Sequence, residues 1–581
     1  MKKHIQEIIQ QFYENRNFFI LPLCFLAFTT VCYIICGCCG VYHNLFEKIF
    51  YEVLISFWLL SPLLLWGNVV VRLFTAFCMT MISIAHIISA GTALLYQVCA
   101  AETFWEVLAA SSLLEIKEFL RELSPLTLFL AVAALLVGPL SCFALVIIIS
   151  NKLLTHQQQR PFLRRVVRIP FLLCFLPFTC IIIFYISSSN HEKLFKKSLL
   201  SRYYYEFTVF QKRMGTLAKI KELPVPYEDV KFNDAASNLL GVIVIGESAS
   251  RNHLGVYGYA RNTTPYFSEI KKELLLFDNV LSSSTITPDA LKYLFTNACL
   301  RDKEFAPKAT LLQVLAHLGA ETYYVSNQGR WSHYNMPCTL IFSQATEKVF
   351  LSASGLGEKV FQYDEVILKD FSSFLNLQPK KQPRFIFLHL MGSHRKYDAR
   401  VPAKEVLFRP DYRDHLSYGQ EASGANHELN YYDSSIAYTD KILKQIVLSL
   451  KSQKDQPSFL LYFSDHGEVM NAQGRNKRSY KCTRREAYEI PFIIWTNEQY
   501  RKSFPETIEN GKKNLHKLVQ ADRLFPSLFS LMQISWKNFP YEQDIFSEKF
   551  VATKDVYSMQ GKSTLFTDKE GKPVIFQEVR N

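Results

Sequence analysis

The stretch Leu239-Leu240-Gly241-Val242-Ile243-Val244-Ile245 is a continuous apolar run rich in valine and isoleucine, and it leads directly into Gly246-Glu247-Ser248. Runs of this kind are typical of strands buried on both faces of a parallel sheet. Similar short runs recur at residues 322–325, 385–390, 459–463 and 491–495, and segments with helical periodicity, such as 434–450, separate them. This alternation predicts a doubly wound α/β fold.

Ionisable residues follow several of these predicted strands. Glu247 follows the first, and Asp465 and His466 follow the fourth. In such sheets ligands bind outside the carboxyl ends of the strands. A carboxylate and an imidazole offer an oxygen and a nitrogen ligand to one divalent ion, with Glu247 as a third. Three protein ligands with one open position are typical of a catalytic zinc site.

Each of these residues also has an ordinary structural explanation. An aspartate after a strand often caps the next helix, and a lone histidine is more often structural than a metal ligand. Their coincidence at successive strand ends favours the metal site.

Thr287 precedes a predicted helix. Because proline is favoured at the first helical position, Pro288 places Thr287 at the N-cap of a helix that runs through Leu291 to Phe295. A hydroxyl there feels the positive end of the helix dipole, and a zinc ion would lower its pKa further and make it a nucleophile. The alternative is a threonine that only caps the helix.

The first third of the chain predicts a membrane domain. The chain has 581 residues, of which 49% are hydrophobic, and the long uncharged runs lie near the N-terminus. About 20 apolar residues in a helix cross a hydrocarbon core of about 30 Å. Five runs are long enough, and they predict a multi-pass domain of five transmembrane helices within residues 1–188: residues 18–38, 50–66, 69–95, 126–150 and 169–187.

Lysine and arginine predict the orientation of this domain. They precede the first run and crowd the loop 151–168, and short cytoplasmic loops retain positive charge. Five crossings then put everything after residue 187 outside. The net charge of +13 indicates attraction to anionic membrane lipids, because no nucleic-acid-binding motif accompanies it.

Residues 189–235 mix basic and aromatic side chains, among them Tyr203, Tyr204 and Tyr205. This composition predicts a bridging segment with helices in the lipid headgroup layer. A solvated linker is the alternative, but it would leave many aromatic side chains exposed. Residues 236–581 are then the catalytic domain.

A set of motifs in chain order resembles the phosphoethanolamine transferases of Gram-negative bacteria, which belong to the alkaline phosphatase and sulfatase superfamily. The resemblance covers most of residues 239–500, and its motifs are Val244-Ile245-Gly246-Glu247-Ser248, Tyr257-Gly258-Tyr259, Thr263-Thr264-Pro265, Thr287, His389-Leu390-Met391-Gly392-Ser393-His394, Tyr432-Asp433 with Tyr438 and Asp440, and Tyr462-Phe463-Ser464-Asp465-His466-Gly467-Glu468. It implies a catalytic domain of the alkaline phosphatase and sulfatase type, located in the periplasm and anchored to the bacterial inner membrane.

The resemblance also implies a mechanism. Zinc would be bound by Glu247, Thr287, Asp465 and His466. Thr287 would take phosphoethanolamine from phosphatidylethanolamine, release diacylglycerol and pass the group to lipid A or to the heptose of the lipopolysaccharide core. Substrate contacts are implied for two further residues, His394 and Asn327, the latter next to Gln328.

Some residues depart from the lipid A branch of that family. The segment 469–480 contains no histidine, and its Gly474-Arg475-Asn476 stretch is closer to the core-heptose branch. One zinc site is therefore expected, and a second is left open. Glu102-Thr103 resembles the family's donor-headgroup motif, but Phe104 departs from it. Whether Cys299 and Cys338 form a disulfide is also left open.

Three alternative functions are weighed. A phosphoglycerol transferase would use the same metal-activated threonine with a different donor. A sulfatase is disfavoured because the chain has no Cys-x-Pro-x-Arg segment to supply a formylglycine. A lipid-binding or transport protein would need charged residues along its spans, where only Glu52, Arg72 and His86 are candidates.

Overall fold

A computed structural model describes most of the second half of the chain and parts of the first. The described residues are 27–36, 38, 46–52, 69–96, scattered positions between 105 and 148, 199–220, 222–302, 305–328, 337–351, 362–377, 382–408, 424–470, 485–554, 556–558, 564–567 and 573–578.

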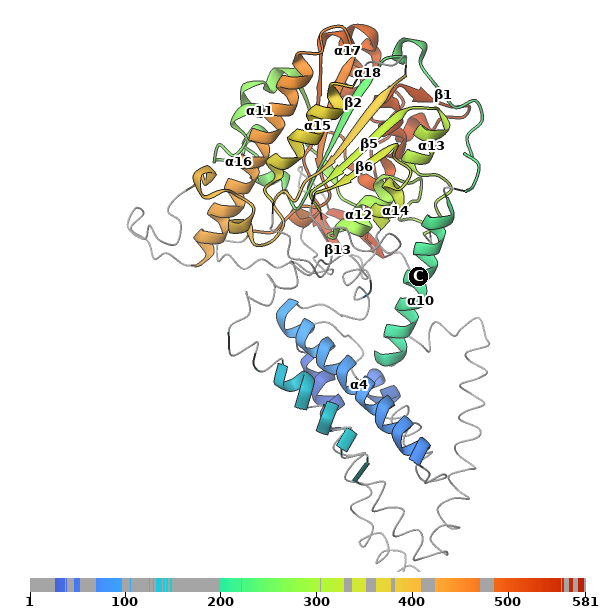
Figure 1. Ribbon diagram of the computed structural model, residues 1–581, viewed down its shortest axis with the longest axis vertical. Helices are drawn as coiled ribbons and strands as arrows, with labels where there is room; N and C mark the ends of the chain where they lie inside the picture. The colour runs from blue at the N-terminus through green and yellow to red at the C-terminus, as the bar shows by residue number, and fades with distance from the viewer. Residues whose placement is uncertain are drawn as a thin grey trace, which may run out of the picture. The chain divides into compact units, whose positions relative to one another are not determined.

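A seven-stranded sheet in the order β3-β9-β8-β2-β7-β5-β6 forms the centre of the larger of two compact units, called the catalytic unit because it contains the predicted catalytic domain. Strands β2, β5 and β6 of this sheet are labelled in Figure 1. Its strands are β2 (Leu240–Gly246), β3 (Leu274–Phe277), β5 (Glu321–Ser326), β6 (Glu347–Phe350), β7 (Arg384–His389), β8 (Ser458–Ser464) and β9 (Phe492–Thr496). From β8 to β6 all neighbouring strands are parallel. The predicted α/β fold and its five strands are confirmed.

The direction of one strand and the two edges of the sheet differ from the parallel arrangement that the sequence predicts. β9, predicted as 491–495, pairs antiparallel with both β8 and β3. An apolar run shows that a strand is buried but not which way it runs, so its direction depends on the connection. The edge strands β3 and β6, of four residues each, were not predicted.

Strand β2 lies in the middle of the sheet, and all seven of its residues are buried. Gly241 faces the rings of Phe459 on β8 and Phe385 on β7, which are its partners in the strand register. The absence of a side chain at position 241 lets both rings pack over the centre of the sheet.

Helices cover both faces of this sheet (Figure 1). On one face, Ile436 and Ile446 of α16 (Gly424–Lys451) share a buried cluster with Val242 and Val244 of β2. On the other face, Phe342 of α14 (Pro337–Phe342) packs against Phe387 of β7. Other helices of this unit are α11 (Pro265–Glu269), α12 (Thr287–Leu294), α13 (Leu311–His317), α15 (Ile367–Leu375), α17 (Glu498–Ser503), α18 (Pro505–Asn514) and α19 (Phe525–Leu531).

Short strands outside the sheet complete the unit. β1 (Lys231–Phe232) pairs with β11 (Ile534–Ser535), and β4 (Val280–Leu281) pairs with β10 (Val519–Gln520). A separate three-stranded sheet contains β12 (Val556–Ser558), β14 (Pro573–Glu578) and β13 (Thr564–Thr567) in that order.

The chain divides into two compact units, and the boundary falls inside α10 (Leu199–Ile220) between Gln211 and Lys212. In the first unit, α4 (Val69–Tyr96) agrees with the predicted span 69–95. Among the described residues, it is the one helix long and apolar enough to cross a membrane, and Ala27–Cys36 and Val132–Ser141 are shorter apolar helices.

The other predicted spans are not tested to the same extent. Those at 18–38, 50–66 and 126–150 are described only in part, and 169–187 lies outside the described residues. The number of five spans therefore stays a prediction, as do the domain bounds 1–188, 189–235 and 236–581. Helix α10 forms within the predicted bridging segment, whose place at a membrane surface is likewise a prediction.

We predict that Gly241→Ala destabilises the catalytic unit. The added methyl group would lie 2.5 Å from Phe459 and 2.6 Å from Phe385, so two buried rings must shift. Overpacking of this kind costs about 1–3 kcal/mol of unfolding free energy. Thermal unfolding of the purified full-length protein measures the loss. Gly215→Ala on α10 is the control, because nothing lies within 4 Å of its added methyl. Equal midpoints for the two variants would contradict the packing argument.

Candidate metal centre and active site

Glu247, Asp465 and His466 come together where two neighbouring strands end. β2 and β8 pair in parallel with Gly246 opposite Ser464, so the next residues along the two strands, Glu247 and Asp465, emerge side by side. One ligand atom from each of the three side chains lies within 4.8 Å of the others, and all three side chains are buried. The predicted trio therefore forms one cluster.

The imidazole of His466 is oriented as a metal ligand would be. Its Nδ1 lies 2.8 Å from the carbonyl oxygen of Gly467, which can only accept a hydrogen bond, so Nδ1 carries the proton. Nε2 faces Glu247 Oε1 at 3.6 Å and Asp465 Oδ2 at 3.4 Å. Two carboxylates around one ring nitrogen require positive charge there, either a proton on Nε2 or a cation held among the three side chains, so these donors fit a divalent metal.

Asp465 is fixed by backbone donors and stays ionised. Its Oδ1 accepts hydrogen bonds from the N–H groups of Ser248 at 2.9 Å and His466 at 2.7 Å. Burial by itself raises the pKa of this carboxyl, but His466 and the surrounding hydrogen-bond donors hold the pKa below its ordinary value. Oδ2 is thereby left directed at the cluster.

The hydroxyl of Thr287 joins this cluster. Its Oγ1 lies 2.6 Å from Asp465 Oδ2 and 3.0 Å from Glu247 Oε2, and its single proton is donated to one of them. Helix α12 begins at Thr287 itself, with Ile286 as the N-cap, and no side chain caps it. The predicted N-cap position was therefore wrong by one residue. The purely capping explanation is contradicted, because the hydroxyl is bonded to the carboxylates.

A third carboxylate, Asp364, organises the loop that supports Glu247. It accepts hydrogen bonds from the backbone of Met391 at 2.8 Å and of Gly392 at 2.7 Å. Gly392 has a φ of +51°, and a side chain there would lie 2.9 Å from the Glu247 nitrogen. Ser393 N–H then donates to Glu247 O at 2.9 Å. Sequence reasoning missed Asp364, because no strand or motif precedes it.

The two predicted substrate contacts lie around this same loop. The amide nitrogen of Asn327 donates to Asp364 at 2.8 Å and to Gln362 O at 2.9 Å, so this side chain is bound to the framework. Its neighbour Gln328 instead reaches the cluster, 3.4 Å from Glu247 Oε2. His394 is half-buried in the turn after Gly392. The roles of Asn327 and His394 in substrate binding stay predictions.

Other motif residues stabilise the framework. Asp433 on α16 accepts hydrogen bonds from Tyr259 at 2.9 Å and Arg261 at 2.8 Å. Asp440 accepts the backbone N–H groups of Tyr266 and Phe267 at the start of α11. These carboxylates hold the segment after β2 against α16 rather than forming part of the metal cluster.

Both described cysteines of the catalytic unit are free thiols, so Cys299 and Cys338 do not pair. Cys299 donates instead to Asp522. The Glu102-Thr103-Phe104 motif and the Gly474-Arg475-Asn476 stretch lie outside the described residues.

Residues 240–534 match the sequence model of the sulfatase family. The chain belongs to the sulfatase family. Among curated relatives, it is 30% identical to phosphoethanolamine transferase EptC of Escherichia coli K12 over 301 residues, half of each chain. It is 27% identical to phosphoethanolamine transferase CptA of Salmonella typhimurium over 361 residues, 60% of each chain. This sulfatase-family chain thus spans about half the length of the curated relatives it matches.

Two solved structures share its fold. The zinc complex of the C-terminal periplasmic domain of Escherichia coli EptC aligns with a TM-score of 0.52 and 24% identity, covering 61% of this chain and 96% of that one. The integral membrane protein EptA of Neisseria meningitidis aligns with a TM-score of 0.57 and 17% identity, covering 90% and 98%. The names of the curated relatives EptC and CptA, together with the sulfatase match, confirm the resemblance to phosphoethanolamine transferases within the sulfatase family.

We predict that Asp364→Asn weakens metal binding without unfolding the protein. The loop around Gly392 would lose a charged acceptor, and loss of such an outer partner costs about 10–100-fold in metal affinity. Competition for zinc against a chelator measures the effect, with circular dichroism as the check on folding. Asp398→Asn, an exposed aspartate of the same region, is the matched control. Equal zinc affinity in both variants would show that Asp364 does not support the cluster.

Proposed function

We propose that the protein transfers phosphoethanolamine from phosphatidylethanolamine to lipopolysaccharide, at a core heptose or at lipid A. The observation that carries the proposal is the position of the Thr287 hydroxyl, 2.6 Å from Asp465 and 3.0 Å from Glu247. A hydroxyl in this position is suited to act as a nucleophile once a cation balances the two carboxylates.

Glu247, Asp465, His466 and Thr287 are the proposed zinc ligands. A zinc ion held by them would lower the pKa of the Thr287 hydroxyl and offset negative charge on the phosphoryl group. In the part of the chain that the structure describes, no other group of three or more histidine, cysteine or acidic side chains is arranged to hold a metal. We therefore propose one zinc ion and leave a second open.

The proposed reaction has two displacements at phosphorus. In the first, Thr287 Oγ1 attacks the phosphorus of the donor, the bond to the diacylglycerol oxygen breaks, and diacylglycerol leaves with a proton. In the second, an oxygen of the acceptor attacks the phosphoethanolamine-threonine intermediate, and Thr287 leaves. In the first step the proton of the Thr287 hydroxyl passes to the diacylglycerol oxygen, and in the second step the proton of the attacking acceptor oxygen returns to Thr287. Glu247 and Asp465 would hold the metal and orient the Thr287 hydroxyl, which lies within hydrogen-bond distance of both. His394 is the proposed substrate contact from the adjacent loop.

A covalent path suits two bulky lipids, because each can occupy the same site in turn. The alternative function, a phosphoglycerol transferase, would use the same threonine. The curated relatives carry the phosphoethanolamine name, which favours the first donor.

We also propose that the protein is anchored in the bacterial inner membrane with its catalytic domain, residues 236–581, in the periplasm. Helix α4 is apolar and long enough to cross a bilayer. The similarity in fold to an integral membrane transferase over 90% of this chain supports the same architecture. In this arrangement residues 1–188 contact membrane lipids, and residues 189–235 bridge to the catalytic domain.

We predict that Thr287→Ala abolishes formation of the covalent intermediate. Full-length protein incubated with phosphatidylethanolamine should carry phosphoethanolamine on Thr287, which peptide mass spectrometry detects. Without the hydroxyl, lipopolysaccharide modification should fall by about 1,000-fold or more.

Thr287→Ser is the matched variant, because it keeps the hydroxyl and should keep part of the activity. Zinc content should be measured for all three proteins, since the alanine variant retains three of the four proposed ligands. An adduct elsewhere in the chain, or modification that persists at the original rate in Thr287→Ala, would refute the assignment. A phosphoglycerol adduct would support the alternative donor.

A further inference from the structure

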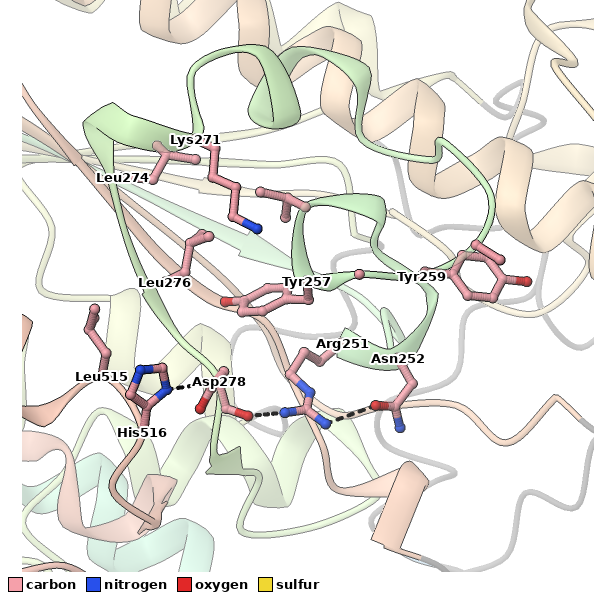
Figure 2. Close-up of a pocket in the computed structure, with 13 residues that line it drawn as sticks. Arg251, Asn252, Tyr257, Tyr259, Lys271, Leu274, Leu276, Asp278, Leu515 and His516 are labelled. Carbon is pink, nitrogen blue, oxygen red and sulfur yellow. Dashed lines mark hydrogen bonds and ion pairs between the residues drawn. The ribbon is translucent and has the colours of Figure 1, made fainter. Parts of the chain in front are cut away.

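A cavity in the catalytic unit lies outside the metal cluster. Its volume is about 640 Å³, and Figure 2 shows three segments of the catalytic unit converging on it. Cavities of this size commonly hold small molecules. Its lining residues are Arg251, Asn252, Val256, Tyr257, Gly258, Tyr259, Ala260, Lys271, Leu274, Leu276, Asp278, Leu515 and His516.

The cavity lies against β3, the edge strand of the central sheet. Leu274 and Leu276 alternate along this strand, so they share one face, and Asp278 continues the alternation. Because β9 is antiparallel to both β3 and β8, those two strands run in the same direction, and Phe277 is in register with Phe463 through β9.

This register fixes the distance between the cavity and the metal cluster. Asp278 follows β3 at the same edge of the sheet at which Asp465 follows β8. The two strands are two spacings apart, about 10 Å. Arg251, which donates to Asp278 O on the same side of the cavity, is only four residues after Glu247. A single elongated ligand could therefore contact both the cavity and the metal cluster.

One wall of the cavity is apolar. Leu274, Leu276 and Leu515 contribute aliphatic side chains, and Tyr257 contributes its ring. The Tyr257 hydroxyl is bonded to the backbone, 3.1 Å from Phe277 O and 3.2 Å from the nitrogen of Phe492. Its ring rather than its hydroxyl is therefore available to a ligand.

The opposite wall is polar, and most of its charges are already paired. Arg251 donates to Asp278 O and lies 3.2 Å from Glu489, while His516 lies 2.8 Å from Asp278 Oδ2. Lys271 differs, because no described residue forms a hydrogen bond or an ion pair with its ammonium group. Figure 2 shows its side chain extending into the cavity toward the Tyr257 ring.

We propose that this cavity binds a saccharide that carries one anionic group, with that group at Lys271 and a sugar ring over Tyr257. Sugars have an apolar face and polar edges, which match the two walls. An acyl chain would leave Lys271 without an anionic partner, and inorganic phosphate alone would leave the leucines and the tyrosine ring without a contact. This inference rests on the proposed function: it assigns the saccharide part of the glycolipid acceptor to a site about 10 Å from the metal cluster.

The test measures binding directly, by equilibrium dialysis of the full-length protein in detergent against glucose 6-phosphate. Lys271→Gln should weaken binding by about threefold or more, as expected for one partly solvated charge contact. Lys272→Gln is the matched control, since it removes the same charge from an exposed neighbour that does not line the cavity. Glucose and inorganic phosphate, tested separately, should each bind more weakly than glucose 6-phosphate.

A second arm distinguishes a glycolipid saccharide from a soluble sugar phosphate. Core oligosaccharide released from lipopolysaccharide should displace glucose 6-phosphate from the wild-type protein, and this displacement should weaken in Lys271→Gln. If only the soluble sugar phosphate binds, the acceptor assignment is overturned. If both lysine variants weaken binding equally, or if inorganic phosphate binds as tightly as the sugar phosphate, the saccharide site is overturned.

These outcomes are separable from those for the proposed function. Absence of a Thr287 adduct in the wild-type protein would refute the transfer reaction, whatever the dialysis result. A normal adduct together with identical glucose 6-phosphate binding by Lys271→Gln and wild type would refute the cavity inference alone.

Discussion

The parallel pairing of β2 with β8 is the constraint on which the candidate site depends. It sets Gly246 opposite Ser464, so Glu247 and Asp465 must emerge together at the carboxyl edge of the sheet. Burying two carboxylates beside one another costs several kcal/mol per ion unless opposite charge compensates them. The cluster therefore has a strong physical requirement for a cation. The Thr287 hydroxyl lies beside the same two carboxylates, where the proposed zinc would make it a nucleophile.

The polar residues around this edge have two distinct tasks. Glu247, Asp465 and His466 bring one ligand atom each to within 4.8 Å of the others, whereas Asp433 and Asp440 on α16 accept hydrogen bonds from the segment that follows β2. Tyr432 belongs to the second group, since its hydroxyl donates to Ser248 O and accepts from Ser250 N, both at 2.8 Å. A rigid framework of this kind holds the ligands in position before a metal binds, which lowers the cost of ordering them.

Much of this arrangement was predictable because it depends on local pattern. Continuous apolar runs located β2, β5, β7 and β8, and the residues after β2 and β8 gave the metal cluster. Strand β6 was missed because two of its four residues are charged and none is buried, and Asp364 was missed because its partners Met391 and Gly392 are distant in sequence. The predicted N-cap position of Thr287 was wrong for a related reason. Pro288 indicates that a helix starts nearby, but it does not indicate that the Thr287 hydroxyl donates to a carboxylate distant in sequence.

By itself the sequence determined the α/β class of the catalytic unit, the three residues of the candidate metal cluster and the candidate nucleophile. Each of these can be recognised from residues that are adjacent in the chain: apolar runs for the strands, and the polar residues that follow them. Only the tertiary structure decided that β9 runs antiparallel, that Asp364 supports Glu247, and that a cavity opens over β3 beside Lys271. Each of these three features depends on contacts between segments that are distant in sequence. Strand pairing and loop packing determine those contacts, and no local pattern in the sequence records them.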